Sequence, residues 1–192
     1  TFKYAHVTYF FNGYNETPYE GEYRILIPSL TTPQLASNPE MMASAITDRA
    51  IAAIQEHSFD FILINYANGD MIAHTGNYDA GIKTAEIVDR EIGRILKVAL
   101  ATPAHILITS DHGNLEEMYN PLTGRYETQH DASPVPCYLI GPGLEGKKFI
   151  NQDTYSKETV GILSDVAPTI LNILGIKPPP EMTGHNLLEK LI

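Results

Sequence analysis

Residues 60–74 read DFILINYANGDMIAH, and they join a short apolar run to a polar segment that carries Asp70 and His74. The run 61–64 is apolar throughout and has polar neighbours on both sides, which is typical of a strand buried on both faces of a parallel sheet. Ligands of such sheets bind beyond the carboxyl ends of the strands, where the polar segment lies. This stretch therefore predicts a parallel sheet with a functional site near Asp70.

Strands and helices alternate on both sides of this stretch. Apolar and β-branched runs predict further strands at 4–11, 104–109 and 135–140, and apolar positions at helical spacing predict helices at 44–57, 78–100 and 164–174. The alternation indicates an α/β fold with a mainly parallel sheet flanked by helices. No repeat, low-complexity tract or linker interrupts it, so residues 1–192 are interpreted as one domain.

The composition argues against several classes of function. A net charge of −10, from 23 acidic and 13 basic residues, disfavours nucleic acid as a partner, because phosphate binding needs a basic surface. No run approaches the roughly 18 apolar residues of a membrane span, and the first residues contain no signal peptide. A single cysteine, Cys137, fits a reducing compartment, so a cytoplasmic protein is expected. The chain begins with Thr1 rather than Met, and we expect it to start within a longer protein.

Two Asp–His pairs follow predicted strands. Asp70 and His74 are four residues apart, so in a helix both side chains project from one face and can hold a divalent cation. Asp111 and His112 follow the strand at 104–109, and they share a metal only if the backbone turns there. His130 lies in the loop before the strand at 135–140. Each has a plainer interpretation: a surface hydrogen-bonded pair, an aspartate cap beside an incidental histidine, and a loop histidine without a role.

The coincidence of these residues favours a metal site. Three of the seven histidines fall in loops at strand ends, and two of them stand beside an aspartate. Three histidines and two aspartates supply one three-ligand site and part of a second. Catalytic metal sites keep a coordination position open, and paired metals suit phosphoryl transfer.

Five motifs distributed along the chain resemble one family. They are AHVTYFFNG (5–13), NYANGDMIAHTG (65–76), TSDHGNLEEM (109–118), TQHDASPVP (128–136) and LSDVAPTILNILGI (163–176) with EMTG (181–184). In this order they are similar to segments of the cofactor-independent phosphoglycerate mutases of bacteria and plants, within the alkaline-phosphatase superfamily. The resemblance implies an alkaline-phosphatase-like α/β fold that lacks its amino-terminal strands. It covers the metal-binding, phosphatase-like domain only.

The resemblance also implies a reaction and a set of site residues. Asp70, His74 and His130 would bind one Mn²⁺, and Asp111 and His112 would bind the other; Zn²⁺, Co²⁺ and Mg²⁺ are alternative ions. Lys3 matches a lysine that contacts the transferred phosphate. The implied enzyme is a glycolytic isomerase that interconverts 3-phosphoglycerate and 2-phosphoglycerate through a phosphoserine, and it is expected to be a monomer.

The sequence departs from the family in what it lacks. The family's nucleophilic serine and a further aspartate ligand belong to an amino-terminal segment, and an inserted transferase domain supplies the arginines that orient the glycerate. None of these is present, so Ser110 is not assigned as the nucleophile, and the chain alone is expected to be inactive. Two alternatives remain: another phosphotransferase or phosphomutase of the superfamily, and a non-catalytic metal-binding module.

Overall fold

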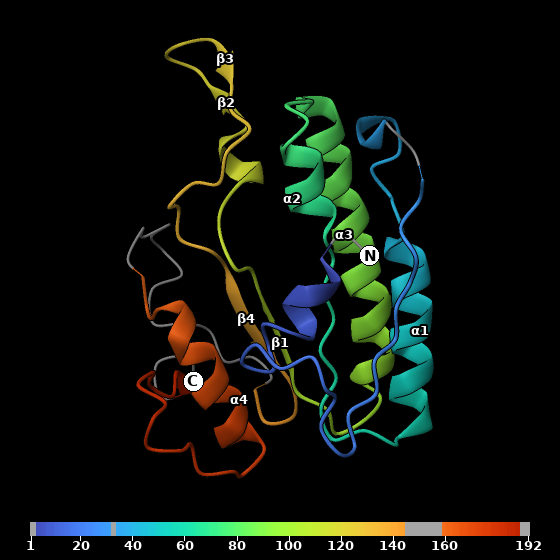
Figure 1. The fold of residues 1–192 in the computed structure, drawn as a ribbon, viewed down its shortest axis with the longest axis vertical. Helices are drawn as coiled ribbons and strands as arrows, with labels where there is room; N and C mark the ends of the chain where they lie inside the picture. Colours follow the sequence, from blue (N-terminus) through green and yellow to red (C-terminus); the bar gives the residue numbers. More distant parts are fainter. Residues whose placement is uncertain (1–2, 32–33, 145–158, 189–192) are drawn as a thin grey trace. The chain divides into compact units, whose positions relative to one another are not determined.

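The structure is a computed structural model that describes residues 3–31, 34–144 and 159–188. The chain divides into two compact units, which are described separately here (Figure 1). The first unit comprises Thr1–Val98 and Asn114–Asp131, and the second comprises Ala99–Gly113 and Ala132–Ile192. None of the described helices is both long enough and apolar enough to cross a membrane.

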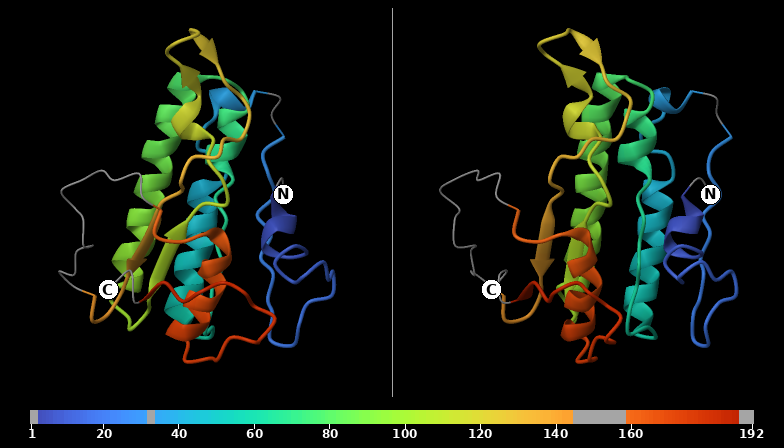
Figure 2. Two further views of the ribbon diagram at one scale, coloured as in Figure 1. Left: turned by 90° about the vertical axis from the view of Figure 1, so that its left-hand side faces the viewer. Right: turned by 60° about the vertical axis from the view of Figure 1, so that its left-hand side comes forward.

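The first unit is built around helices. Its α-helices are α1 (Ala43–Glu56), α2 (Asn68–Ala73) and α3 (Tyr78–Ala99), and its 3-10 helices are η1 (Tyr4–Val7), η2 (Leu35–Ser37) and η3 (Leu115–Glu117). A short hairpin of β2 (Tyr119–Asn120) and β3 (Arg125–Tyr126) follows η3. Helices α1 and α3 lie side by side in both views of Figure 2. The buried residues of α1 recur every three or four positions, as a helix with one face on the core requires: Ala43, Thr47, Ala50 and Ala53.

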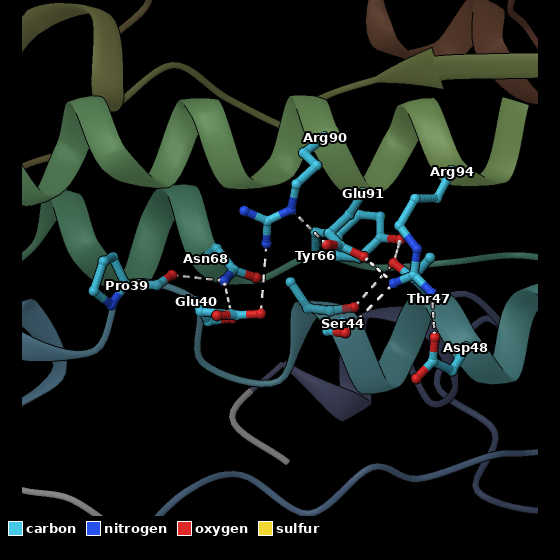
Figure 3. Close-up of polar contacts among 11 residues, drawn as sticks. Pro39, Glu40, Ser44, Thr47, Asp48, Tyr66, Asn68, Arg90, Glu91 and Arg94 are labelled. Carbon is cyan, nitrogen blue, oxygen red and sulfur yellow. Dashed lines mark hydrogen bonds and ion pairs between the residues drawn. The ribbon is translucent and has the colours of Figure 1, made fainter.

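An ion-pair cluster centred on the buried Glu91 joins α1 to α3 (Figure 3). Glu91 on α3 is 1% exposed, and its carboxylate accepts hydrogen bonds from Arg94 at 2.7 Å and Arg90 at 3.1 Å. Arg94 also pairs with Asp48 on α1. Burial alone would raise the pKa of Glu91, but the hydrogen bonds from Arg94, Thr47 and Arg90 outweigh it and lower that pKa. The charged carboxylate therefore fixes the position of α3 on α1.

Helix α2 is held at its first residue. Asn68 is 2% exposed, and its Nδ2 donates to the carbonyls of Pro39 and Glu40, both at 2.9 Å (Figure 3). Just before α2, the Tyr66 hydroxyl lies 2.6 Å from Thr47 Oγ1 on α1. These contacts fix where α2 begins, and hence where Asp70 and His74 project.

The described residues of the second unit form one strand pair, a 3-10 helix and an α-helix. Strands β1 (Ile106–Thr109) and β4 (Cys137–Ile140) pair antiparallel, with Ile106 opposite Ile140 and Thr109 opposite Cys137. The 3-10 helix η4 (Leu163–Asp165) leads into α4 (Val166–Ile173). Asp165 is 3% exposed and accepts backbone hydrogen bonds from Ile162 and His185, so its carboxylate stabilises the start of this helical segment.

Most predicted elements are found near their expected positions, namely α1, α3, β1, β4 and the helical segment formed by η4 and α4. The strand predicted at 4–11 is wrong, because this segment forms η1 and then turns. Thr8 Oγ1 donates to the Tyr4 carbonyl at 2.9 Å, and the Phe10 amide donates to the Ala5 carbonyl, so local bonds outweigh the weak β propensity.

The prediction of a mainly parallel sheet is also wrong for the described residues, because both described strand pairs are antiparallel. Residues 61–65 are not assigned as a strand. An apolar run becomes a strand only where a neighbour satisfies its backbone, and none is paired with it in the part of the chain that the structure describes.

Candidate metal centre

Three predicted ligands converge in the first unit. Asp70 lies in the first turn of α2, His74 is the residue that caps the carboxyl end of α2, and His130 comes from the segment after the β2–β3 hairpin. Asp70 Oδ1 lies 3.1 Å from His74 Nε2 and 2.9 Å from His130 Nε2, and the two Nε2 atoms are 3.2 Å apart. The side chains offer one carboxylate oxygen and two imidazole nitrogens within 4.8 Å of one another.

These separations fit a metal centre. With metal–ligand bonds of about 2.0–2.1 Å, two ligand atoms of a tetrahedral site lie about 3.3 Å apart. All three observed separations are within a few tenths of an ångström of that value. Two imidazoles with one carboxylate form a three-ligand set, which leaves a position for water or substrate. The donor set and its geometry therefore suit a catalytic divalent ion.

The His74 ring is oriented by the backbone of the same unit. Its Nδ1 lies 2.7 Å from the Thr128 carbonyl, which can only accept, so Nδ1 carries a proton. In the neutral ring Nε2 then holds a lone pair, and it faces the Asp70 carboxylate across 3.1 Å. Two acceptor atoms at this distance repel unless a cation lies between them. A proton or a divalent ion satisfies the arrangement, and a backbone carbonyl on the far nitrogen is usual for metal-binding histidines.

Asp70 is held as a carboxylate. Its side chain is 14% exposed, Lys3 Nζ lies 2.7 Å from Oδ2, and Asn114 Nδ2 donates to Oδ1 at 3.0 Å. Burial alone would raise the pKa of Asp70, but the hydrogen bonds from Lys3 and Asn114 and the charges of Lys3 and His74 outweigh it and lower that pKa to about 2. Asp70 is therefore ionised over the whole range in which a histidine can bind a metal.

The packing of η3 on the helices of this unit places Asn114 beside Asp70. A Cβ added to Gly69 would lie 3.1 Å from Leu115 Cδ1, and one added to Gly81 would lie 2.6 Å from Met118 Sδ. A side chain at Gly81 would therefore have to displace Met118 from its place between η3 and α3. Met118 is 1% exposed, so it is a core residue of the contact.

Asp111 and His112 lie in the second unit, directly after β1. His112 Nε2 is 3.6 Å from Asp111 Oδ2, and the Asp111 side chain is 65% exposed. Ser110 Oγ donates to the His112 carbonyl at 2.9 Å, so the turn expected after this strand is stabilised by a side chain. The pair offers two ligands of the second predicted site.

The structure thus brings together four of the six predicted site residues: Lys3, Asp70, His74 and His130. That they hold a metal or a phosphate stays a prediction. Sequence reasoning missed Asn114 and the Thr128 carbonyl. Asn114 stands inside the motif TSDHGN, but its spacing carries no sign of its contact with Asp70, and a backbone carbonyl leaves no trace in a sequence.

Comparison with known proteins identifies a family for this chain. The sequence model of the Metalloenzyme superfamily matches residues 1–178, and the chain belongs to that superfamily. The chain is 45% identical to the 2,3-bisphosphoglycerate-independent phosphoglycerate mutase of Pseudomonas entomophila, over 98% of this chain and 35% of that protein. The enzyme of the same name from Clostridioides difficile is 44% identical, over 99% of this chain and 36% of its own length.

A solved structure shows the same fold. The phosphoglycerate mutase of Leishmania mexicana, crystallised at low cobalt concentration, matches 95% of this chain and 35% of its own with a TM-score of 0.79 and 28% identity. These similarities confirm the resemblance inferred from the five motifs and the α/β fold class. The chain spans about 35% of the length of the relatives that it matches.

Proposed function

We propose that this chain is the metal-binding part of an isomerase that interconverts 3-phosphoglycerate and 2-phosphoglycerate, the glycolytic step, in the cytoplasm. The convergence of Asp70, His74 and His130, with Lys3 beside them, carries the proposal. The relatives support it, since they are named for this activity. We assign residues 1–192 to one phosphatase-like domain whose substrate is a phosphoglycerate and whose preferred ion is Mn²⁺.

The residues of the centre have distinct roles in this proposal. Asp70, His74 and His130 would hold one ion, which would supply Lewis-acid stabilisation of the phosphoryl oxygens. The Lys3 ammonium has three donors and uses one on Asp70 Oδ2, so two are left for phosphate oxygens. Thr128 keeps His74 in the tautomer whose Nε2 binds a metal.

The complete reaction needs more than these residues. Asp111 and His112 would hold the second Mn²⁺ together with ligands from outside this chain. The nucleophilic serine that forms the phosphoserine, and the arginines that orient the glycerate, would come from the remaining part of an enzyme that acts as a monomer. The names of the relatives favour this function over a phosphopentomutase, phosphodiesterase or sulfatase, and over a non-catalytic module.

Broadening of ³¹P resonances by Mn²⁺ tests the proposal, because the paramagnetic ion affects only phosphorus nuclei close to it. We expect 3-phosphoglycerate to broaden more with the Mn²⁺-loaded chain than with free Mn²⁺, and the excess to vanish in Asp70→Ala. Lys3→Met should keep Mn²⁺ bound and lose most of the excess. Lys83→Met, an exposed lysine on α3, is the matched control and should behave as the parent chain. Equal broadening in the parent chain and in Asp70→Ala would refute the proposal.

A further inference from the structure

Of the two polar atoms of the Asn114 side-chain amide, only the nitrogen has a hydrogen-bond partner among the described residues. The residue is 5% exposed, and its Nδ2 donates to Asp70 Oδ1 at 3.0 Å. Its Oδ1 is buried and has no hydrogen-bond partner among the described residues. A buried acceptor without a partner destabilises the folded state, so packing alone would favour an apolar side chain here.

The orientation of the amide follows from the charge on Asp70. Rotating the amide would place its oxygen against the Asp70 carboxylate, which forms an ion pair with the Lys3 ammonium at 2.7 Å. The oxygen therefore stays on the buried side without a partner, and the nitrogen stays on Asp70. The Asn114 amide N–H donates to Glu116 Oε2 at 2.9 Å, so the backbone of the residue is fixed as well.

The two oxygens of Asp70 are held by different partners. Lys3 lies on Oδ2 at 2.7 Å, whereas Asn114, His74 and His130 all lie on Oδ1. With Oδ2 taken by an ammonium, only Oδ1 is turned toward the two imidazoles. A carboxylate so restrained has lost its rotational freedom before any ion arrives, and a pre-oriented ligand binds more tightly.

We propose that Asn114 is a positioning residue that holds Asp70 with one oxygen toward His74 and His130, and that it thereby sets the affinity of the centre for a divalent ion. This inference rests on the proposed metal binding. The buried oxygen of Asn114 does not stabilise the fold, and we attribute its presence to the orientation of Asp70 as a ligand.

The Asn114→Leu variant tests this directly. Leucine has the same branched arrangement of side-chain heavy atoms as asparagine, although it is larger, and it removes both the donor and the unpartnered oxygen. Titration calorimetry of the 192-residue chain with Mn²⁺ should show binding about 10-fold to 100-fold weaker, as for other partners of metal ligands. The melting temperature without metal should stay the same or rise. The visible absorption of bound Co²⁺ should also change, since the orientation of a ligand changes.

Thr84→Val is the matched control. Thr84 on α3 is 0% exposed, and its Oγ1 is the same kind of buried, unpartnered oxygen within the described residues. Valine should raise the melting temperature slightly and leave Mn²⁺ affinity and the Co²⁺ spectrum unchanged. Asn114→Leu removes a buried unpartnered oxygen and the contact with Asp70, whereas Thr84→Val removes only a buried unpartnered oxygen.

Each outcome decides the inference. Wild-type Mn²⁺ affinity in Asn114→Leu overturns it, while proposed metal binding stands if Asp70→Ala still abolishes that binding. If leucine lowers the melting temperature, Asn114→Ala replaces it, and a loss of affinity no larger than the loss of folded protein also overturns the inference. If the parent chain binds no Mn²⁺, the proposed function itself fails, which is a different result from either.

Discussion

The two Asp–His pairs of this chain differ in how firmly their side chains are held. Asp70 and His74 stand one helical turn apart on α2, and His130 joins them as a third ligand. Asp70 is 14% exposed and bonded to Lys3 and Asn114. The Asp111 side chain, by contrast, is 65% exposed, and Nε2 of the adjacent residue, His112, lies 3.6 Å from its Oδ2.

The difference shows what makes an Asp–His pair a candidate centre. Helical spacing brings two side chains to one face without further help, whereas adjacent residues converge only if the backbone turns. Burial and oriented donors then fix one ionised oxygen toward the histidines in the first pair. Among the described residues of its own unit, the second pair has neither a third ligand nor burial of its carboxylate. We expect the first pair to function as a site in this chain and the second to be incomplete.

The largest expected effect follows from that incompleteness. The chain alone should not convert 3-phosphoglycerate to 2-phosphoglycerate with Mn²⁺, because positioning of nucleophile and substrate contributes many orders of magnitude in rate. A coupled assay on chain free of any full-length enzyme measures this. Turnover that disappears in Asp111→Ala would contradict the interpretation of the second pair as incomplete. That pair would then belong to a complete site, with Ser110 as the candidate nucleophile to test first.

Metal binding should separate the two pairs next. Asp70→Ala should weaken Mn²⁺ binding more than about 100-fold, because it removes the only anionic ligand of the three-ligand set. Asp111→Ala should leave the tight binding event within about twofold of the parent chain. Calorimetric titration of both variants, with melting curves as the control for folding, makes the comparison. Equal losses in the two variants would show that one centre uses both aspartates.

The pH dependence of Mn²⁺ affinity tests histidine ligation at the first pair. A histidine must release its proton to bind a metal, so Mn²⁺ affinity should fall as pH drops from about 7.5 to about 5.5. Asp70 cannot cause this fall, because the pKa of Asp70 is about 2 and its carboxylate stays charged throughout. Two histidine ligands predict a limiting slope of two protons per ion, and one histidine predicts a slope of one. A flat profile would contradict histidine ligation.

Regular periodicity explains which parts of the fold could be predicted from the sequence. Helices α1 and α3 repeat apolar residues at helical spacing, and β1 and β4 are short apolar runs with a partner strand. Residues 4–11 are rich in β-branched and aromatic residues, which favour a strand, yet Thr8 donates to the Tyr4 carbonyl and the segment turns. A propensity does not reveal whether a partner strand exists, and the direction of strand pairing is a property of the whole sheet.

The site divides in the same way. Asp70 and His74 were predictable because helical spacing sets their geometry, and His130 because it stands in a strand-end loop. Asn114 and the Thr128 carbonyl were not, since both act through packing between segments far apart in sequence. Asn114 is 44 residues from Asp70 in the sequence, and Thr128 is 54 residues from His74. Both contacts depend on how η3 and the hairpin pack on the rest of their unit.

The smallest expected effect concerns stability without metal. The pKa of Asp70 is lowered from 3.8 to about 2, so the folded state favours the carboxylate by about 2 kcal/mol. The sign follows from the direction of that shift: this contribution is present above pH 4 or so and is lost as pH falls through about 2. Asp70→Asn keeps the shape and an acceptor for Lys3 but removes the charge. Urea unfolding with a chelator present should therefore show a loss of about 2 kcal/mol near neutral pH and little difference near pH 2.

Asp111→Asn is the comparison variant. It should change the free energy of unfolding by less than about 0.5 kcal/mol at either pH, as substitutions at exposed positions usually do. A loss in Asp111→Asn as large as that in Asp70→Asn would mean that burial and the bonds from Lys3 and Asn114 do not distinguish the two pairs, because the charge of both carboxylates would then matter equally to the fold.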